Sequence, residues 1–134
     1  MTTLSVSENI RALLLSDGVV TPMYINKEPA DPIECLTIYD TGGDPSNPKY
    51  ILDYPTIQIR SRAADYDTCF QNIQECFEFL NGRPSETVNT TRFTGIMATT
   101  GLLSLGQDSN QKYLYTTNFR LFVENATSGH RLPL

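Results

Sequence analysis

An apolar stripe in the middle of the chain constrains the fold more than any other feature. Between Asp65 and Gly82, apolar side chains recur every three or four residues, which is the repeat of one face of an α-helix. Asp65 is a suitable N-terminal cap, and Asn81-Gly82 followed by Pro84 ends the pattern. The stripe consists of Tyr66, Cys69, Phe70, Ile73, Cys76, Phe77 and Leu80. A helix of about four turns at this place excludes an all-β fold.

The segments on both sides of this helix have the alternation of strands. In segment 56–62, Ile57, Ile59 and Ser61 alternate with polar residues, which predicts a half-buried strand. Segments 91–100 and 112–124 are rich in β-branched and aromatic residues. In the last of these, Leu114 and Phe122 lie on the face opposite the other apolar residues, so both faces of that strand have side chains to bury.

The first third of the chain predicts one more helix and two strands. The apolar residues of segment 6–14 have helical spacing, with Ser5 or Ser7 available as a cap. Segments 23–25 and 34–40 are typical of strands. A loop then follows as far as residue 54. It is long for a compact domain, and its apolar tip, Tyr50-Ile51-Leu52, is a candidate contact surface.

This order of elements predicts the α+β class. We expect a mostly antiparallel sheet of four to six strands with two main helices packed on one face, in the order helix, three strands, helix, and two or three strands. The length of 134 residues fits one domain. We expect an ordered core over about 5–124 and a flexible C-terminal tail over 125–134.

Charge and cysteine content limit the classes of function. Ten Lys and Arg against fifteen Asp and Glu give a net charge of −5, which disfavours tight binding to nucleic acid. The sequence has no run of eighteen apolar residues and no signal-peptide pattern at Met1, so we expect a soluble, unexported protein with no membrane contact. Three cysteines cannot all pair, and Cys69 and Cys76 lie too far apart along a helix for a disulfide, which favours a reducing compartment.

The residues offer little for catalysis or cofactor binding. The one histidine, His130, lies in the predicted tail, so a catalytic triad or a His-rich metal site is not expected. Cys69 and Cys76 belong to the apolar stripe, where burial raises thiol pKa values. The pair Gly42-Gly43 is followed by Asp44-Pro45 rather than by Lys and a helix, unlike a phosphate-binding loop. We therefore predict no cofactor and no metal.

One motif leaves an enzymatic alternative open. Asp40-Thr41-Gly42 after an apolar strand resembles the turn of dimeric aspartic proteases, in which two Asp40 carboxylates would share a proton. The central helix argues against that fold. In the structural interpretation, Asp40 and Thr41 bond backbone N–H groups of a turn while Gly42 and Gly43 supply positive φ. A second turn is predicted around Gly106 and Asp108.

Three blocks of sequence together resemble one protein family. They are Tyr39-Asp40-Thr41-Gly42-Gly43, then segment 53–62 with Tyr66 and Leu80-Asn81-Gly82, and then Gly106-Gln107-Asp108 through Tyr113 to Asn118-Phe119-Arg120. In this order they are similar to the tail terminator (tail completion) or minor capsid proteins of tailed bacteriophages. The resemblance spans about residues 6–124, and segment 83–92 and the tail lie outside it.

The resemblance implies a structural virion protein and no enzymatic activity. Such a subunit closes into a ring, a hexamer, at the head-proximal end of the tail tube, where it stops tube polymerisation and meets the head-side connector. It is made in the host cytoplasm and ends in the neck of the virion. The genome passes through the lumen without specific binding, and six copies at −5 each carry −30, which repels phosphate. The alternative is another neck or tube component, such as a head-tail adaptor.

A ring needs surfaces that neighbours cover. We assign Arg60, Arg62 and Arg120 to ion pairs with neighbouring subunits or with the tube. The alternative is that these arginines are ordinary solvated strand residues. The other predicted interface residues are Gln58, Tyr50, Ile51, Leu52, Leu114 and Phe122.

Overall fold

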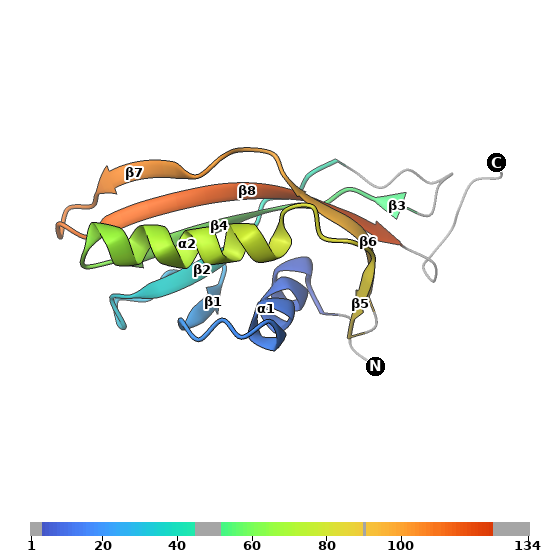
Figure 1. Ribbon diagram of the computed structural model, residues 1–134, viewed down its shortest axis with the longest axis horizontal. Coiled ribbons are helices and arrows are strands. Elements are labelled where there is room, and N and C mark those ends of the chain that lie inside the picture. Colours follow the sequence, from blue (N-terminus) through green and yellow to red (C-terminus); the bar gives the residue numbers. More distant parts are fainter. Residues whose placement is uncertain (1–3, 45–51, 90, 125–134) are drawn as a thin grey trace.

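The computed structural model describes residues 4–44, 52–89 and 91–124, which form one curved sheet with two helices (Figure 1). The helices are α1 (Val6–Ser16) and α2 (Tyr66–Leu80). The strands are β1 (Met23–Ile25), β2 (Cys35–Asp40), β3 (Leu52–Asp53), β4 (Thr56–Ala63), β5 (Glu86–Val88), β6 (Thr91–Ala98), β7 (Leu103–Gln107) and β8 (Tyr113–Glu124). Neither helix is long and apolar enough to cross a membrane.

The long strand β8 organises the sheet. The strand order is β1-β2-β4-β8-β6-β5, and β3 and β7 also pair with β8. On one side β8 pairs with the whole of β4 and then with β3, and on the other it pairs first with β7 and then with β6. All of these pairings are antiparallel, whereas β1 runs parallel to β2 at one edge. The sheet is therefore mostly antiparallel, as the sequence predicts.

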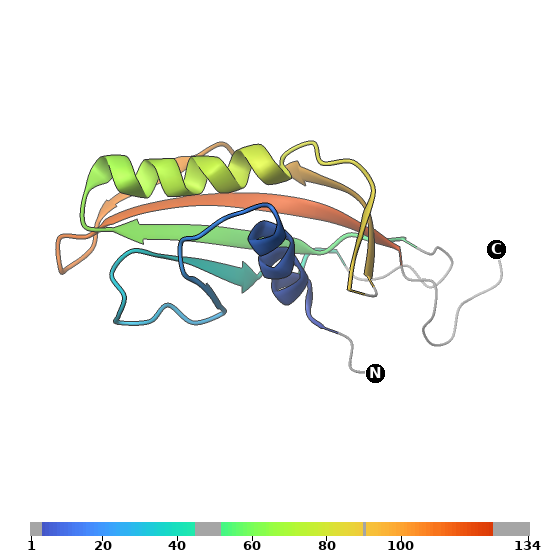
Figure 2. The same cartoon turned by 60° about the horizontal axis from the view of Figure 1, so that its bottom comes forward.

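Both helices lie on the same face of the sheet (Figures 1 and 2). α2 packs along β4 and β8, and α1 packs on β2. Ser5 and Glu8 form a capping box at the start of α1, and the Asp65 side chain accepts from the Thr68 N–H at the start of α2. The core between the helices and the sheet is fully buried, with Ile10, Ile59, Ile73, Phe93, Phe119 and Leu121 among its largest side chains.

The sequence missed three short strands, so the sheet has eight strands rather than four to six. β3 and β5 have two and three residues, too few for an alternation to mark them, and β1, which is as short as β5, is predicted from its composition rather than from alternation. β7 contains Gly106 and a β-bulge, and all five of its residues are exposed. Tyr50, Ile51 and the tail 125–134 with His130 lie outside the described residues.

Candidate subunit interface

The face of the sheet that the helices leave open holds most of the predicted interface residues. On β4, the residues that alternate with the buried Ile57 and Ile59 are half-buried and point away from the helices. On β8 the same face carries Leu114, Asn118, Arg120 and Phe122, and Gln58 is paired with Asn118. The arginines of this face are Arg60, Arg62, Arg120 and Arg92, of which the first three were predicted to bond neighbouring subunits. These three arginines differ in how many hydrogen bonds and ion pairs their guanidinium groups make within the chain.

Arg62 is fully engaged within the chain. Its guanidinium donates to the Glu28 carboxylate and to the carbonyl oxygens of Pro29, Pro32 and Ile33, and only 12% of the side chain is exposed. All these acceptors lie in the loop between β1 and β2, where backbone carbonyls lack strand partners. Arg62 therefore anchors this loop over the end of the open face. The intrachain bonds leave Arg62 little capacity for an ion pair with a neighbouring subunit, and that predicted pair stays a prediction.

Arg60 and Arg120 make fewer bonds within the chain than Arg62 does, so more of their hydrogen-bond donors remain for a partner. Arg60 makes an ion pair with Glu28 at 3.4 Å, and Arg120 makes one with Asp44 at 3.7 Å. Both Nε atoms are buried without a hydrogen-bond partner among the described residues. The Arg120 side chain is 41% exposed and that of Asp44 is 62% exposed, so their long ion pair contributes little and can be exchanged for another carboxylate. Arg120 is thus the predicted arginine that fits an interface best.

The apolar residues predicted on the open face are covered by the chain itself. Leu114 is only 8% exposed, because it lies between Arg62 and Gly106 in the register and the anchored loop reaches this end of the sheet. The Phe122 ring packs edge-on against Tyr54, with centroids 5.5 Å apart. Leu52 pairs with Glu124 in β3 and is half-buried. Leu114 is thus buried, whereas Leu52 and Phe122 are half-buried, and their contacts with neighbouring subunits stay predictions.

Asp40 has a structural role that differs from the predicted one. Its carboxylate accepts from the backbone N–H of Ser7 at 3.1 Å, from the Ser7 hydroxyl at 2.7 Å and from the Asn26 amide at 2.9 Å. It thus stabilises the N-terminus of α1, where an anion is favoured, rather than the N–H groups of its own turn. A carboxylate occupied in this way does not have the arrangement that a protease dyad requires.

The turn after Asp40 depends on its glycines. Gly42 and Gly43 have φ of +89° and +83°. A Cβ on Gly43 would lie 2.4 Å from the Tyr54 carbonyl oxygen, so this position also excludes larger residues by contact. The Thr41 hydroxyl bonds the Thr56 hydroxyl at 2.6 Å, which joins the turn to the start of β4.

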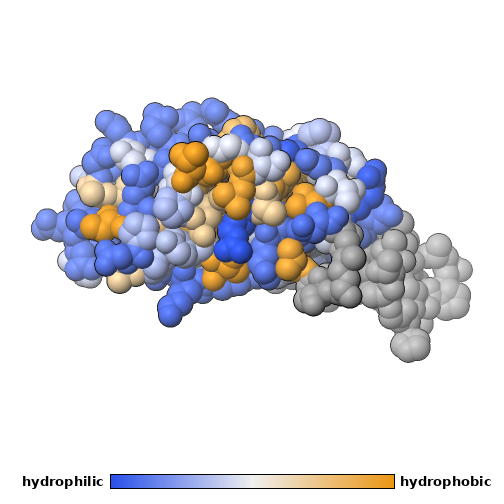
Figure 3. Space-filling model, turned by 90° about the horizontal axis from the view of Figure 1, so that it is seen from below, coloured by the Kyte–Doolittle hydropathy of each residue, from blue (hydrophilic) through white to orange (hydrophobic). Residues whose placement is uncertain are grey.

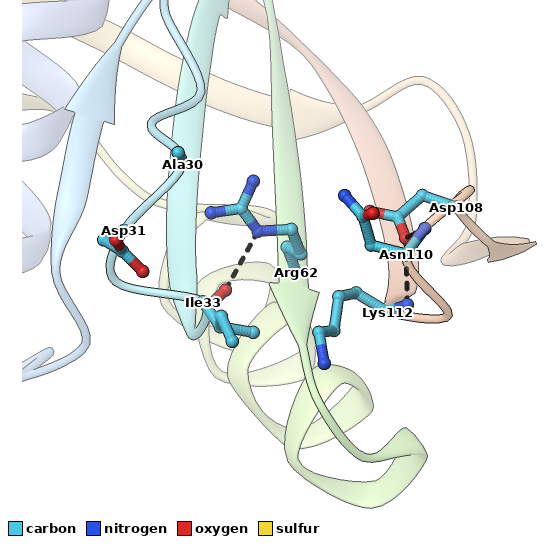
Figure 4. A pocket seen from close by; sticks show the side chains of 7 residues that line it. All are labelled: Ala30, Asp31, Ile33, Arg62, Asp108, Asn110 and Lys112. Carbon is cyan, nitrogen blue, oxygen red and sulfur yellow. Dashed lines mark hydrogen bonds between the residues drawn. The ribbon is translucent and has the colours of Figure 1, made fainter.

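The turn between β7 and β8 borders a cavity of about 250 Å³ (Figure 4). Gly106 has φ of +77°, and the Asp108 carboxylate accepts from the N–H groups of Asn110 and Lys112, which lowers the Asp108 pKa. The cavity lies between this turn, Arg62 and the β1–β2 loop. It is lined by Ala30, Asp31, Ile33, Arg62, Asp108, Asn110 and Lys112.

Two charged side chains of this cavity, Arg62 and Asp108, are already engaged by the fold. Arg62 holds the loop and Asp108 holds the turn, as the dashed bonds in Figure 4 show. Nowhere in the described parts of the chain do three or more His, Cys, Asp or Glu residues gather as metal ligands would. The three cysteines are buried, and burial raises the pKa of Cys76 to about 12, so its thiol is not a nucleophile near neutral pH. The described residues of this region therefore fit a role in protein contacts better than a role in catalysis.

The sequence missed the apolar residues that are in fact exposed. On β7, Leu103 is 55% exposed and Leu105 is 44% exposed, and Met97 of β6 is similarly open. At the other side of the molecule, Leu15 and Val20 are 58% and 91% exposed. A signal was present, because segment 93–107 is the longest in the chain without Asp, Glu, Lys or Arg, and segment 18–26 is the second longest.

Comparisons with known proteins identify a family and a similar fold. The profile of a family described as "Bacteriophage tail terminator protein" matches residues 13–125. The fold is similar to that of a chain in the solved structure "Virion of native gene transfer agent (GTA) particle", with a TM-score of 0.66 and 14% sequence identity over 90% of this chain and 95% of that one. No curated protein matches the sequence.

Proposed function

The chain belongs to the bacteriophage tail terminator family, and from this membership we propose that it forms a ring that caps the head-proximal end of the phage tail tube. The ring stops tube polymerisation and joins the tube to the head-side connector. The observation that carries the proposal is the family match over residues 13–125, which includes every strand of the sheet. It favours a terminator over the alternative of a head-tail adaptor.

The geometry supports a role based on contacts. A cyclic ring uses two different patches on each subunit, and this subunit exposes apolar residues at two separate places, on β7 and around Val20. Growth stops when the free face of a ring no longer matches the next tube ring. We further propose six copies in the ring and no enzymatic step.

The charge of the chain suits a passage for DNA. Six copies at −5 each carry −30, so the assembled ring repels phosphate on balance. The open-face arginines do not form a free cationic surface, because Glu28, Asp44 and Glu124 pair with four of them. The genome can therefore pass the ring without being held in it.

The test is assembly with and without tail tubes. Purified protein is added to tubes of the major tail protein and viewed by negative-stain electron microscopy, while native mass spectrometry gives the copy number in solution. We expect closed rings at one end of each tube and tubes that no longer elongate. Protein that remains monomeric and does not bind tube ends contradicts the proposal. Rings that bind isolated connectors but never tubes would indicate an adaptor instead.

A further inference from the structure

We propose that β7 of one subunit pairs with β1 of the next, so that the sheets of neighbouring copies join edge to edge around the ring. This inference rests on the proposed ring function and names the two surfaces that close the ring. The occupant of each edge is a second copy of this chain. The two edges lie at opposite sides of the sheet, β7 at the top and β1 at the bottom of Figure 1.

β7 is an edge strand that neither charge nor Pro nor a covering strand protects among the described residues, although a β-bulge interrupts its pairing with β8 between Ser104 and Gly106. It pairs with β8 on one side, and no strand among the described residues pairs with its other side. Exposed edges in native proteins are normally guarded by charged residues, by Pro or by a covering element. Segment 93–107 contains no charged residue and no Pro, and Leu103 and Leu105 point into solvent. An edge of this kind needs a strand to cover it.

β5 shows what a guarded edge looks like in the same sheet. It has only three residues, and Glu86 at its start is bonded by Arg83, which also bonds Asp17 at the end of α1. Beyond β5, the Asn89 side chain donates to Asn9 of α1 at 2.8 Å. The chain therefore protects β5 with charge and a helix, and leaves β7 free.

β1 is the matching edge. It pairs only with β2 within the described residues, and it lies in the second-longest uncharged segment, 18–26. Viewed from the side of α1 and β1, the surface shows hydrophobic areas across the middle of the face (Figure 3). Leu15 and Val20, which lie just before β1, are among the most exposed apolar residues of the molecule. Because each copy carries −5, copies meet with least repulsion where both surfaces lack charge.

The register of the sheet places the two edges at the same level. Tyr24 of β1 pairs with Thr37, Thr37 with Arg60, Arg60 with Thr116, and Thr116 with Leu103 of β7. One row of residues thus crosses five strands from edge to edge. A closed ring requires contact patches that do not step along the axis, since a step produces an open helix. For an axis along the strands, β7 and β1 meet this requirement.

Strand direction then fixes how the edges meet. β1 runs parallel to β2, and each later step across β4, β8 and β7 reverses direction, so β7 runs opposite to β1. Rotation about an axis along the strands preserves this relation, and β7 meets the neighbouring β1 as an antiparallel pair. If the row continues across the contact, Leu103 lies opposite Tyr24 of the next copy, and Ser104 lies opposite its Met23.

The test is disulfide trapping between copies. Leu103→Cys and Tyr24→Cys are made as separate proteins, mixed, assembled on tail tubes and oxidised. The native cysteines Cys35, Cys69 and Cys76 are buried and do not compete. We expect a covalent dimer in the mixture and neither protein to cross-link alone. The matched control pairs Leu103→Cys with Thr87→Cys on the guarded edge β5, and we expect no cross-link there.

Each outcome bears on one proposal or both. Rings seen by microscopy without the Leu103 to Tyr24 cross-link overturn the edge pairing but leave the ring function standing. A cross-link of Leu103→Cys alone means that two β7 edges meet, which also overturns it. Absence of rings and of tube binding in the unaltered protein removes the ring function itself.

A second variant checks the same contact without oxidation. Leu103→Lys with Leu105→Lys introduces charges at the proposed junction, and burying them weakens subunit association about tenfold or more. Thr87→Lys is the matched control and leaves association unchanged. Circular dichroism confirms that both proteins are folded. Equal ring yields from the two variants would contradict the proposal.

Discussion

The two faces of the sheet are held by different interactions. On the face under the helices, Ile57, Ile59 and Phe119 are completely buried against α1 and α2. On the open face, Arg62 holds a loop by hydrogen bonds, while Arg120 makes a long ion pair with Asp44. The covered face is therefore complete within one chain. On the open face, the polar groups around Arg62 are hydrogen-bonded within the chain. Arg120 is partly exposed, so its guanidinium can reach a partner.

The largest expected difference between the faces concerns two phenylalanines of β8. Phe119 is fully buried, with its ring centroid 6.2 Å from that of Phe77, whereas Phe122 on the other face is half-buried and packs edge-on against Tyr54. Phe119→Ala lowers the free energy of unfolding by about 3–5 kcal/mol because it leaves a cavity. Phe122→Ala lowers it by about 1–2 kcal/mol. Urea denaturation followed by fluorescence or circular dichroism measures both, and equal losses would contradict the comparison.

The next effect separates two arginines of β4. Arg62→Met removes donors from the carbonyl oxygens of the β1–β2 loop and lowers the free energy of unfolding by about 2 kcal/mol. Arg60→Met is the matched control, because it loses one ion pair at 3.4 Å and costs less than about 1 kcal/mol. Hydrogen exchange of residues 27–34 rises in the first variant only. Unchanged exchange in Arg62→Met would show that the loop does not depend on this side chain.

The covered face also predicts a dependence on pH. Burial raises the pKa of Cys76 to about 12, above the ordinary thiol value of about 9. Between about pH 9 and 12, the Cys76 thiol therefore stays protonated in the folded state and is deprotonated in the unfolded state. This contribution is complete below about pH 8.5 and is lost as pH rises toward 12, by up to about 1.4 kcal/mol per pH unit. Wild type should lose more stability than Cys76→Ala between pH 9 and 11, and parallel losses would be evidence against burial of this thiol.

The comparison also explains what the sequence could and could not predict. The stripe of α2 and the alternation of β4 mark the covered face, because each buried residue there is part of a local repeat. The partners of Arg62 lie about thirty positions earlier in a loop without any repeat, so no pattern indicates them. Asp40 likewise bonds Ser7, which lies 33 residues away, and its role depends on where α1 packs.

The exposed edge was missed for a different reason. Leu103 and Leu105 alternate with Ser104, but an alternation does not say which side of a sheet a strand will occupy. The absence of charge over 93–107 was the available signal, because edge strands that stay uncovered normally carry charge. Uncharged length is thus a better guide to the exposed apolar residues Leu103 and Leu105 than the apolar residues Leu114 and Phe122.

The smallest effect on folding tests the open face most directly. Arg120→Ala removes a long ion pair between two exposed side chains, so it changes the free energy of unfolding of the isolated subunit by less than about 0.5 kcal/mol. If Arg120 instead meets a carboxylate of a neighbouring subunit or of the tube, the same variant weakens ring assembly on tubes. Asp44→Ala is the control, because it frees Arg120 without removing it and leaves assembly intact. An Arg120→Ala protein that folds and assembles normally would assign this arginine to solvent.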